Sequence, residues 1–214
     1  MSKPTFIFDL DGVITKTENY HFLAWKETCK EFGYNLSVSE NEKLKGVGRK
    51  ESLEKIIKWS NITLKPEEFE TILIKKNNLY LENISQINSQ NILVGVQEFL
   101  INAKKENHLI ALYSASKNAK HILNKLEIFG FFDVIIDGND VINSKPHPEG
   151  FIMVANLTNT LPENCVVFED SIAGVEGANS INMYTIGIGD KNTLKNANKV
   201  YQNFNQFSLK EFTE

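Results

Sequence analysis

The sequence predicts an α/β fold in which a parallel sheet carries helices and a separate helical segment is inserted after the first strand. Along most of the chain, short apolar runs alternate with segments of helical period, which is typical of βα units around a parallel sheet. Residues 16–86 depart from this alternation because they are mostly helical. We therefore predict an α/β core of residues 1–15 and 87–214, covered by a helical cap of residues 16–86.

The predicted strands are short apolar runs. They are expected at residues 5–8, 109–113, 134–136, 166–168 and 183–188, and a looser tail follows the last of them. Helices of the core are expected at residues 96–103, 122–126, 151–157 and 172–178. In the cap, one helical face is formed by Leu53, Ile56 and Ile57, and another by Phe69, Ile72, Leu73, Lys76 and Tyr80. A lysine on such a face either extends its charge to solvent or points from the cap into a cleft.

Composition and charge place the chain among globular proteins. Its 214 residues suffice for one core and a smaller lobe, and its hydrophobic and charged fractions, 42% and 23%, are ordinary. The net charge of −4 comes without runs of like charge, and no apolar stretch reaches the ~20 residues of a membrane span. We therefore expect neither a nucleic-acid nor a membrane partner. Cys29 and Cys165 are too few for a disulfide framework, and no signal peptide is recognisable, so we expect a cytoplasmic protein. We also expect it to act as a monomer.

Polar side chains follow four of the predicted strands. Since ligands of a parallel sheet bind beyond the carboxyl ends of its strands, these side chains are expected to converge on one edge. They are Asp9, Asp11 and Gly12, then Ser114, Ala115, Ser116, Lys117 and Asn118, then Ser144, Lys145 and Pro146, and finally Glu169, Asp170 and Ser171.

This set suits phosphoryl transfer assisted by Mg²⁺. The ion prefers hard oxygen ligands, and a divalent cation relieves the repulsion between crowded carboxylates. The carboxylate of Asp9 can be a nucleophile that forms an aspartyl phosphate, and Asp11 can act beside it as general acid and base. Lys145 can neutralise charge on the transferring group, to which Ser114 can donate a hydrogen bond.

Each feature also has an ordinary structural explanation. An Asp after a strand is usually a turn or helix-cap residue, and Ser114 can simply begin a helix. Lys145 before a proline is usually solvated, and Glu169 with Asp170 can be a charged helix start. Four such features in order at four strand ends are jointly improbable, so we favour the catalytic interpretation.

The four strand-end motifs together resemble the signature motifs of the haloacid dehalogenase superfamily. They read Phe8-Asp9-Leu10-Asp11-Gly12-Val13, Ser114, Lys145-Pro146 and Glu169-Asp170. The resemblance spans nearly the whole chain. It implies a Rossmann-like core with a helical cap inserted after the first motif, and Mg²⁺ as the cofactor.

Within that superfamily, further segments resemble the β-phosphoglucomutases. They are Asp11-Gly12-Val13-Ile14-Thr15, Tyr20-His21-Phe22 with Ala24-Trp25-Lys26, Leu44-Lys45-Gly46-Val47 with Arg49, Ser114-Ala115-Ser116-Lys117-Asn118, and Ser144-Lys145-Pro146. The resemblance implies that β-D-glucose 1-phosphate and D-glucose 6-phosphate are interconverted through a phospho-aspartate enzyme and β-glucose 1,6-bisphosphate. A small sugar phosphate is therefore the expected substrate.

The resemblance also implies residue roles. Asp9 would carry the phosphoryl group, Asp11 would shuttle the proton of the sugar hydroxyl, and Ser114 with Lys145 would hold the transferring group. Mg²⁺ would be held by Asp9, the backbone carbonyl of Asp11 and Asp170, with Glu169 at or beside the metal. The implied substrate-binding residues are His21, Trp25, Lys45, Gly46, Val47, Arg49, Lys76, Ser114, Ala115, Ser116, Lys117 and Asn118. Arg49 is also the one arginine among 23 lysines and arginines, which makes it a candidate for a bidentate phosphate contact, although chance explains it as well.

Two departures and two alternatives accompany this interpretation. Lys16 stands where β-phosphoglucomutases usually have an acidic residue, and Tyr113, expected to face the core, stands where a small residue is common. The same four motifs serve phosphatases, so a Mg²⁺-dependent sugar-phosphate phosphatase is the alternative function. A binding or scaffold protein on a degenerate core would lack a catalytic group, and the sequence retains Asp9, Asp11, Ser114, Lys145 and Asp170.

Overall fold

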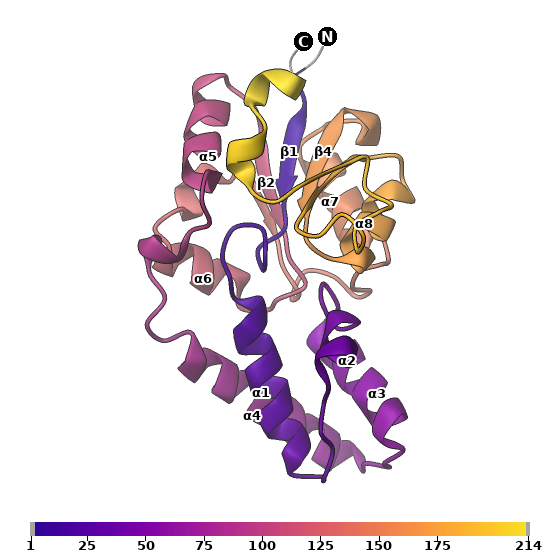
Figure 1. Ribbon diagram of the computed structural model, residues 1–214. Helices are drawn as coiled ribbons and strands as arrows, with labels where there is room; N and C mark the ends of the chain where they lie inside the picture. Colours follow the sequence, from indigo (N-terminus) through magenta and orange to yellow (C-terminus); the bar gives the residue numbers. More distant parts are fainter. Residues whose placement is uncertain (1–2, 213–214) are drawn as a thin grey trace.

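A six-stranded parallel sheet forms the core of the structure, a computed structural model that describes residues 3–212 (Figure 1). Its strands are β1 (Thr5–Phe8), β2 (Ile110–Tyr113), β3 (Val134–Ile136), β4 (Cys165–Glu169), β5 (Tyr184–Ile188) and β6 (Lys199–Tyr201). They lie in the order β3-β2-β1-β4-β5-β6, and every pairing is parallel. The predicted Rossmann-like α/β fold is confirmed.

The edge strand β6 was not predicted from the sequence. A last strand at residues 183–188 followed by a looser tail was expected, but residues 199–201 pair with β5, Lys199 opposite Ile186 and Tyr201 opposite Ile188. Of the three residues of β6 one is exposed and two are half-buried, so they form no apolar run. A short edge strand is specified by pairing with its neighbour rather than by burial of both faces, which explains the error.

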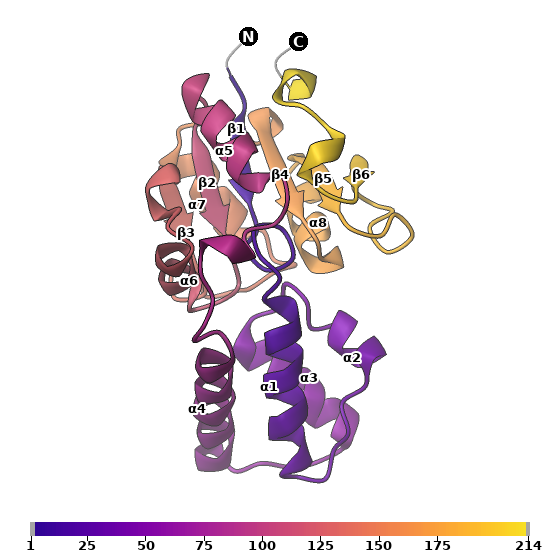
Figure 2. The ribbon, with the colours of Figure 1, turned by 60° about the vertical axis from the view of Figure 1, so that its left-hand side comes forward.

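Helices cover both faces of the sheet (Figures 1 and 2). The first face carries α5 (Val96–Lys105) and α6 (Ala119–Lys125), and the second carries α7 (Glu149–Leu157) and α8 (Ile172–Asn179). Because side chains alternate along a strand, β1 sends Phe6 and Phe8 to the first face and Ile7 to the second.

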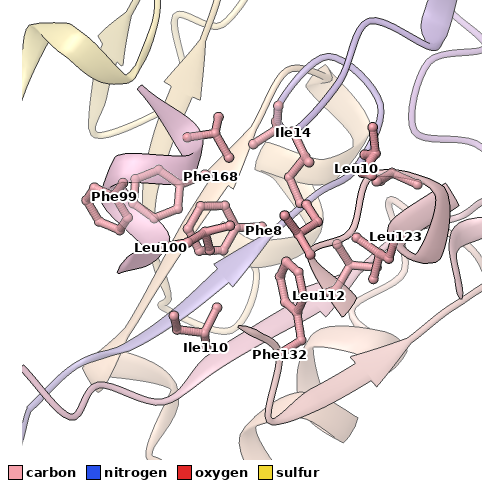
Figure 3. Close-up of a cluster of buried hydrophobic side chains, with 14 of the residues drawn as sticks. Phe8, Leu10, Ile14, Phe99, Leu100, Ile110, Leu112, Leu123, Phe132 and Phe168 are labelled. Atoms are coloured by element: carbon pink, nitrogen blue, oxygen red, sulfur yellow. The ribbon is translucent and has the colours of Figure 1, made fainter. Parts of the chain in front are cut away.

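The first face holds a large aromatic cluster (Figure 3). Phe8 lies between Phe99 of α5 and Phe168 of β4, with ring centroids 5.9 and 4.8 Å away. Burying such a side chain contributes about 1.5–3 kcal/mol. This packing fixes the position of β1 relative to β4 along the strand direction, and therefore the positions of the polar residues that follow the two strands.

The cap lies beyond the carboxyl ends of the strands (Figures 1 and 2). It consists of α1 (Glu18–Lys30), α2 (Val38–Glu42), α3 (Arg49–Ser60) and α4 (Pro66–Asn83). These helices have an apolar cluster of their own, formed by Trp25, Cys29, Leu36, Leu44, Leu53 and Ile56. The division into a core of residues 1–15 and 87–214 and a cap of residues 16–86 remains our proposal. Among residues 3–212, no helix has both the length and the apolar composition that a membrane span requires.

Candidate active site

A tight turn after β1 places the two aspartates. The backbone N–H of Asp9 donates to the carbonyl of Phe168 at 3.0 Å, which continues the β1–β4 pairing one residue past the strand. Gly12 then turns the chain with φ +83°, and its N–H donates to the carbonyl of Thr15 at 2.8 Å. A Cβ at position 12 would lie 2.2 Å from Oδ2 of Asp170, so glycine is required both for the turn and for the close approach of that carboxylate.

Lys145 lies between two buried carboxylates. Its Nζ donates to Oδ1 of Asp9 at 2.6 Å, to the carbonyl of Tyr113 at 3.1 Å, and to Oε1 of Glu169. Burial alone would lower the pKa of Lys145, but the charges of Asp9 and Glu169 raise it above its usual value. The lysine is therefore a permanent cation beneath Asp9.

Glu169 is committed to neighbouring groups. Its Oε1 accepts from Lys145, while Oε2 accepts from the backbone N–H of Ser171 at 3.1 Å and from the Ser171 hydroxyl at 2.8 Å. Both carboxylate oxygens thus orient neighbouring groups. Of the two positions expected for Glu169, at the metal or beside it, this geometry favours the position beside it.

Tyr113 faces the core, as expected. It is fully buried, and its ring packs edge-on against Phe151 with centroids 4.7 Å apart. The Nζ of Lys145 lies 4.7 Å from the centre of the Tyr113 ring. The tyrosine therefore contributes a carbonyl and a ring face to the lysine and does not line the cleft described below.

Three carboxylates gather at the carboxyl ends of β1 and β4. Oxygens of Asp9, Glu169 and Asp170 all lie within 4.8 Å of one another. Burial and the neighbouring negative charges raise the pKa of Asp170 well above its usual value, and burial likewise raises the pKa of Asp9 despite the charge of Lys145. Among residues 3–212, the side chain of Asp170 makes no hydrogen bond or ion pair, so it is a hard oxygen donor without a partner. This donor set fits Mg²⁺, which takes oxygen ligands and would offset the excess negative charge.

Asp11 ends a chain of polar contacts that comes from the cap. Its Oδ1 accepts from the hydroxyl of Thr17 and lies 3.5 Å from Nε2 of His21. The other ring nitrogen of His21, Nδ1, lies 2.7 Å from Nζ of Lys76. An ammonium group can only donate, so while Lys76 is charged Nδ1 accepts and the ring proton sits on Nε2, facing Asp11.

The protonation states agree with this chain of contacts. Burial and the nearby Arg49 lower the pKa of Lys76 to about 7, and burial and Lys76 lower the pKa of His21, which is therefore neutral. Against the effect of burial, His21 and the Thr17 hydroxyl lower the pKa of Asp11, so this carboxylate is ionised at neutral pH and able to accept a proton. The ammonium of Lys76 also lies over the rings of Trp25 and Tyr80, at 5.2 and 5.0 Å from their centres. Of the two orientations considered for Lys76, the structure therefore has the one that points into the cleft.

A single cleft between core and cap brings most of the expected residues together. Its wall contains Asp9, Asp11, His21, Trp25, Lys45, Gly46, Val47, Arg49, Lys76, Ala115, Ser116, Lys117 and Asp170. Four expected residues lie outside that wall. Ser114, Lys145 and Glu169 are buried, and Asn118 donates through Nδ2 to Oδ1 of Asn77 in α4 at 3.0 Å.

Comparisons with known proteins agree with this geometry. The family model described as haloacid dehalogenase-like hydrolase matches residues 6–188. The chain belongs to the haloacid dehalogenase superfamily. It is 35% identical, over 95% of its length and 91% of the relative, to β-phosphoglucomutase of Bacillus subtilis. It also superposes on the crystal structure of β-phosphoglucomutase from Clostridium difficile with a TM-score of 0.95 and 42% identity, covering 99% of this chain and 96% of the other. The resemblance stated from the sequence is thus confirmed.

A phosphatase of the superfamily is also related. The phosphorylated carbohydrates phosphatase of Thermotoga maritima is 30% identical over 81% of this chain and 79% of its own length. Its identity and coverage are both lower than those of the Bacillus subtilis mutase. The comparisons therefore support the phosphatase alternative less.

Four residues of the cleft wall in this superfamily member were not among the expected binding residues: Glu18, Asn41, Leu44 and Ser52. Three of them left a signal in the sequence. Glu18 precedes His21 by three residues and Ser52 follows Arg49 by three, so each pair shares a helical face. Leu44 already belonged to the Leu44–Val47 segment that carries the family resemblance. Asn41 is a polar residue of the short helix α2, and nothing in the pattern distinguishes it from a solvated one.

The cap is closed on the core in this superfamily member. The backbone N–H of Gly48 donates to Oγ of Ser144 at 3.1 Å, and Asn118 bonds Asn77 of the cap. A Cβ at Gly46 would lie 2.3 Å from Oγ of Ser171, so the loop before α3 lies directly against the core. Closure brings Arg49 and Lys76 into the same cleft as Asp9.

Proposed function

We propose that this protein is a β-phosphoglucomutase that interconverts β-D-glucose 1-phosphate and D-glucose 6-phosphate. The observation that carries the proposal is the presence of two charged regions in one closed cleft. The negatively charged region consists of Asp9, Asp11 and Asp170. The positively charged region consists of Arg49, Lys76 and Lys117, which line the same cleft. A mutase must hold a bisphosphate with one phosphate at the nucleophile and the other at a second cationic site. The two positions exchange when the sugar reorients.

Asp9 is the proposed nucleophile. One of its oxygens forms a bond to phosphorus of the bisphosphate, and the bond from phosphorus to the sugar oxygen breaks, which leaves phospho-Asp9 and a sugar monophosphate. In the second half of the reaction the other hydroxyl of the sugar attacks phospho-Asp9 and releases the carboxylate. Lys145 lies 2.6 Å from Asp9 and stabilises the negative charge there in both directions.

Mg²⁺ is the proposed cofactor, held by Asp9, Asp170 and the backbone carbonyl of Asp11. When bound, it supplies positive charge that keeps Asp9 ionised and neutralises the transferring group. Glu169 assists indirectly, because it orients Lys145 and Ser171.

Asp11 is the proposed general acid and base. It gives a proton to the sugar oxygen that leaves phosphorus and takes one from the hydroxyl that attacks phospho-Asp9. Thr17 and His21 hold its carboxylate, and Lys76 sets the tautomer of His21. Because Lys76 and His21 belong to the cap, closure of the cap and positioning of Asp11 are coupled.

Closure also separates transfer to a sugar from transfer to water. With the cap against the core, a bound sugar hydroxyl reaches phospho-Asp9 while bulk water is excluded. The same core chemistry with poorer exclusion of water would give the phosphatase alternative. We further propose that the protein works as a monomer in the cytoplasm without a nucleic-acid partner.

³¹P NMR distinguishes the two functions. Purified protein is mixed with Mg²⁺, β-glucose 1-phosphate and a catalytic amount of β-glucose 1,6-bisphosphate, with Asp9→Asn as the matched inactive control. The proposal predicts glucose 6-phosphate with little inorganic phosphate, and no product from the variant. Inorganic phosphate as the main product would replace the mutase with a phosphatase, and equal activity of the variant would remove Asp9 from the mechanism.

A further inference from the structure

A second cavity adjoins the metal-binding end of the cleft. It has a volume of about 390 Å³. The cleft between core and cap in which the sugar phosphate is proposed to bind, called the sugar-side cleft below, has a volume of about 70 Å³. Its wall comes from the turn after β1, the start of α1, the end of α2, residues 93 and 94, the loop after β5 and residues 202–204. Three residues belong to both walls: Glu18, Lys45 and Asp170. The two spaces therefore meet at a proposed metal ligand, with one acidic and one basic side chain of the cap beside it.

The charge of the second cavity favours cations. Its wall holds four carboxylates, those of Glu18, Glu42, Asp170 and Asp190, and two lysines. One of these lysines, Lys45, is already paired with Glu42 at 3.0 Å. A cavity with excess negative charge raises the local concentration of cations, whereas a sugar phosphate is repelled from it.

Glu18 lines both spaces and has an unsatisfied carboxylate oxygen. Its Oε2 is buried and has no hydrogen-bond partner among residues 3–212. The charges near it are those of Asp11, Lys45 and Lys16. An unsatisfied buried carboxylate oxygen is costly, so a rotation of the Glu18 side chain that turns this oxygen toward a cation in either space is favourable.

The volume of each space determines whether a hydrated ion fits into it. Mg²⁺ gives up its waters reluctantly and keeps several of them when bound. One water takes about 10–15 Å³ of such a cavity, so six waters need roughly 60–90 Å³. The second cavity of about 390 Å³ accommodates that shell, whereas the sugar-side cleft of about 70 Å³ is filled once a sugar phosphate has entered.

We propose that a hydrated divalent cation reaches and leaves Asp170 through the second cavity while substrate occupies the cleft. Glu18 and Lys45, which line both spaces, separate this route from the substrate. The proposal rests on the proposed metal site. Substrate and cofactor then use separate entrances. Loss of the metal does not have to wait for the cap to open.

Mn²⁺ in place of Mg²⁺ tests the route. Binding of Mn²⁺ to the wild type is first measured by EPR. The complex is then mixed with excess Mg²⁺, and release of Mn²⁺ is timed with the cleft empty and with saturating glucose 6-phosphate. Val94→Trp narrows the second cavity at its exposed side, since Val94 lines it and is 61% exposed. Ile142→Trp, at a residue that is 88% exposed and outside both walls, is the matched control.

We expect glucose 6-phosphate to slow Mn²⁺ release from the wild type by less than about threefold. With the sugar phosphate present, Val94→Trp should slow release by about tenfold or more, and Glu18→Ala should accelerate it. If the sugar phosphate slows wild-type release by about tenfold and Val94→Trp matches Ile142→Trp, the metal uses the sugar cleft and the route is refuted. A wild type that does not bind Mn²⁺ at all would instead refute the metal site on which the route rests.

Discussion

The substitution Lys145→Met tests whether one lysine holds two buried carboxylates together. The side chain of Lys145 is 0% exposed, and those of Asp9 and Glu169 are 5% and 0% exposed. Methionine keeps the length of the side chain but removes the shared cation, so both carboxylates stay buried without a counter-charge. Removal of one partner from a buried ion pair costs about 3–5 kcal/mol, and because two carboxylates lose their cation we expect about 4–5 kcal/mol.

Urea unfolding in EDTA, followed by circular dichroism, measures this loss. Adding Glu169→Gln to Lys145→Met removes one of the two buried carboxylates that lack a counter-charge. The double variant should recover about 1–3 kcal/mol of the free energy of unfolding. Lys199→Met, which breaks the exposed pair with Glu211 at 3.1 Å, is the control and should leave the free energy of unfolding almost unchanged.

The dependence on pH provides a second readout for Lys145→Met. Burial already raises the pKa of Asp9, and the lysine is the main group that lowers it. A carboxylate whose pKa is higher in the folded than in the unfolded protein binds more protons when folded, so stability rises as the pH falls. The deficit of the variant should therefore be smaller at pH 5 than at pH 8. A deficit below about 1 kcal/mol, or a double variant less stable than the single one, would refute the argument from shared charge.

Three further predictions concern residues of the candidate site. Asp11→Asn should retain Mn²⁺ binding in EPR titrations while turnover falls on the order of 10²-fold, since its proposed metal ligand is the backbone carbonyl; loss of binding would mean that the roles of the aspartates are wrongly assigned. Arg49→Lys should raise KM about tenfold because the bidentate fork is lost, and the exposed neighbour Lys50→Arg should leave KM unchanged. Lys76→Met should raise the free energy of unfolding by about 1–4 kcal/mol at pH 6, where the buried lysine with its pKa of about 7 is charged, and by less at pH 10; a gain that does not shrink would show that charge is not the cause.

Much of the candidate site could be predicted from the sequence because its motifs are local. Asp9 and Glu169–Asp170 each follow an apolar run directly, Asp11 comes two residues after Asp9, and parallel strands present their carboxyl ends at one edge. The same reasoning was insufficient for β6, whose residues form no apolar run and whose pairing with β5 is a contact between distant segments.

The sequence by itself determined the order of the βα units, the insertion of helices after the first strand and the set of chemical groups, since each depends on periodicity or adjacency along the chain. Only the tertiary structure decided how those groups act on one another. Lys145 meets Asp9 across 136 positions, and Lys76 meets His21 across 55, so no local pattern contains either contact. Both contacts exist because the sheet and the closed cap bury these charges together. The buried carboxylates of Asp9 and Glu169 raise the pKa of Lys145, whereas burial and the nearby Arg49 lower the pKa of Lys76.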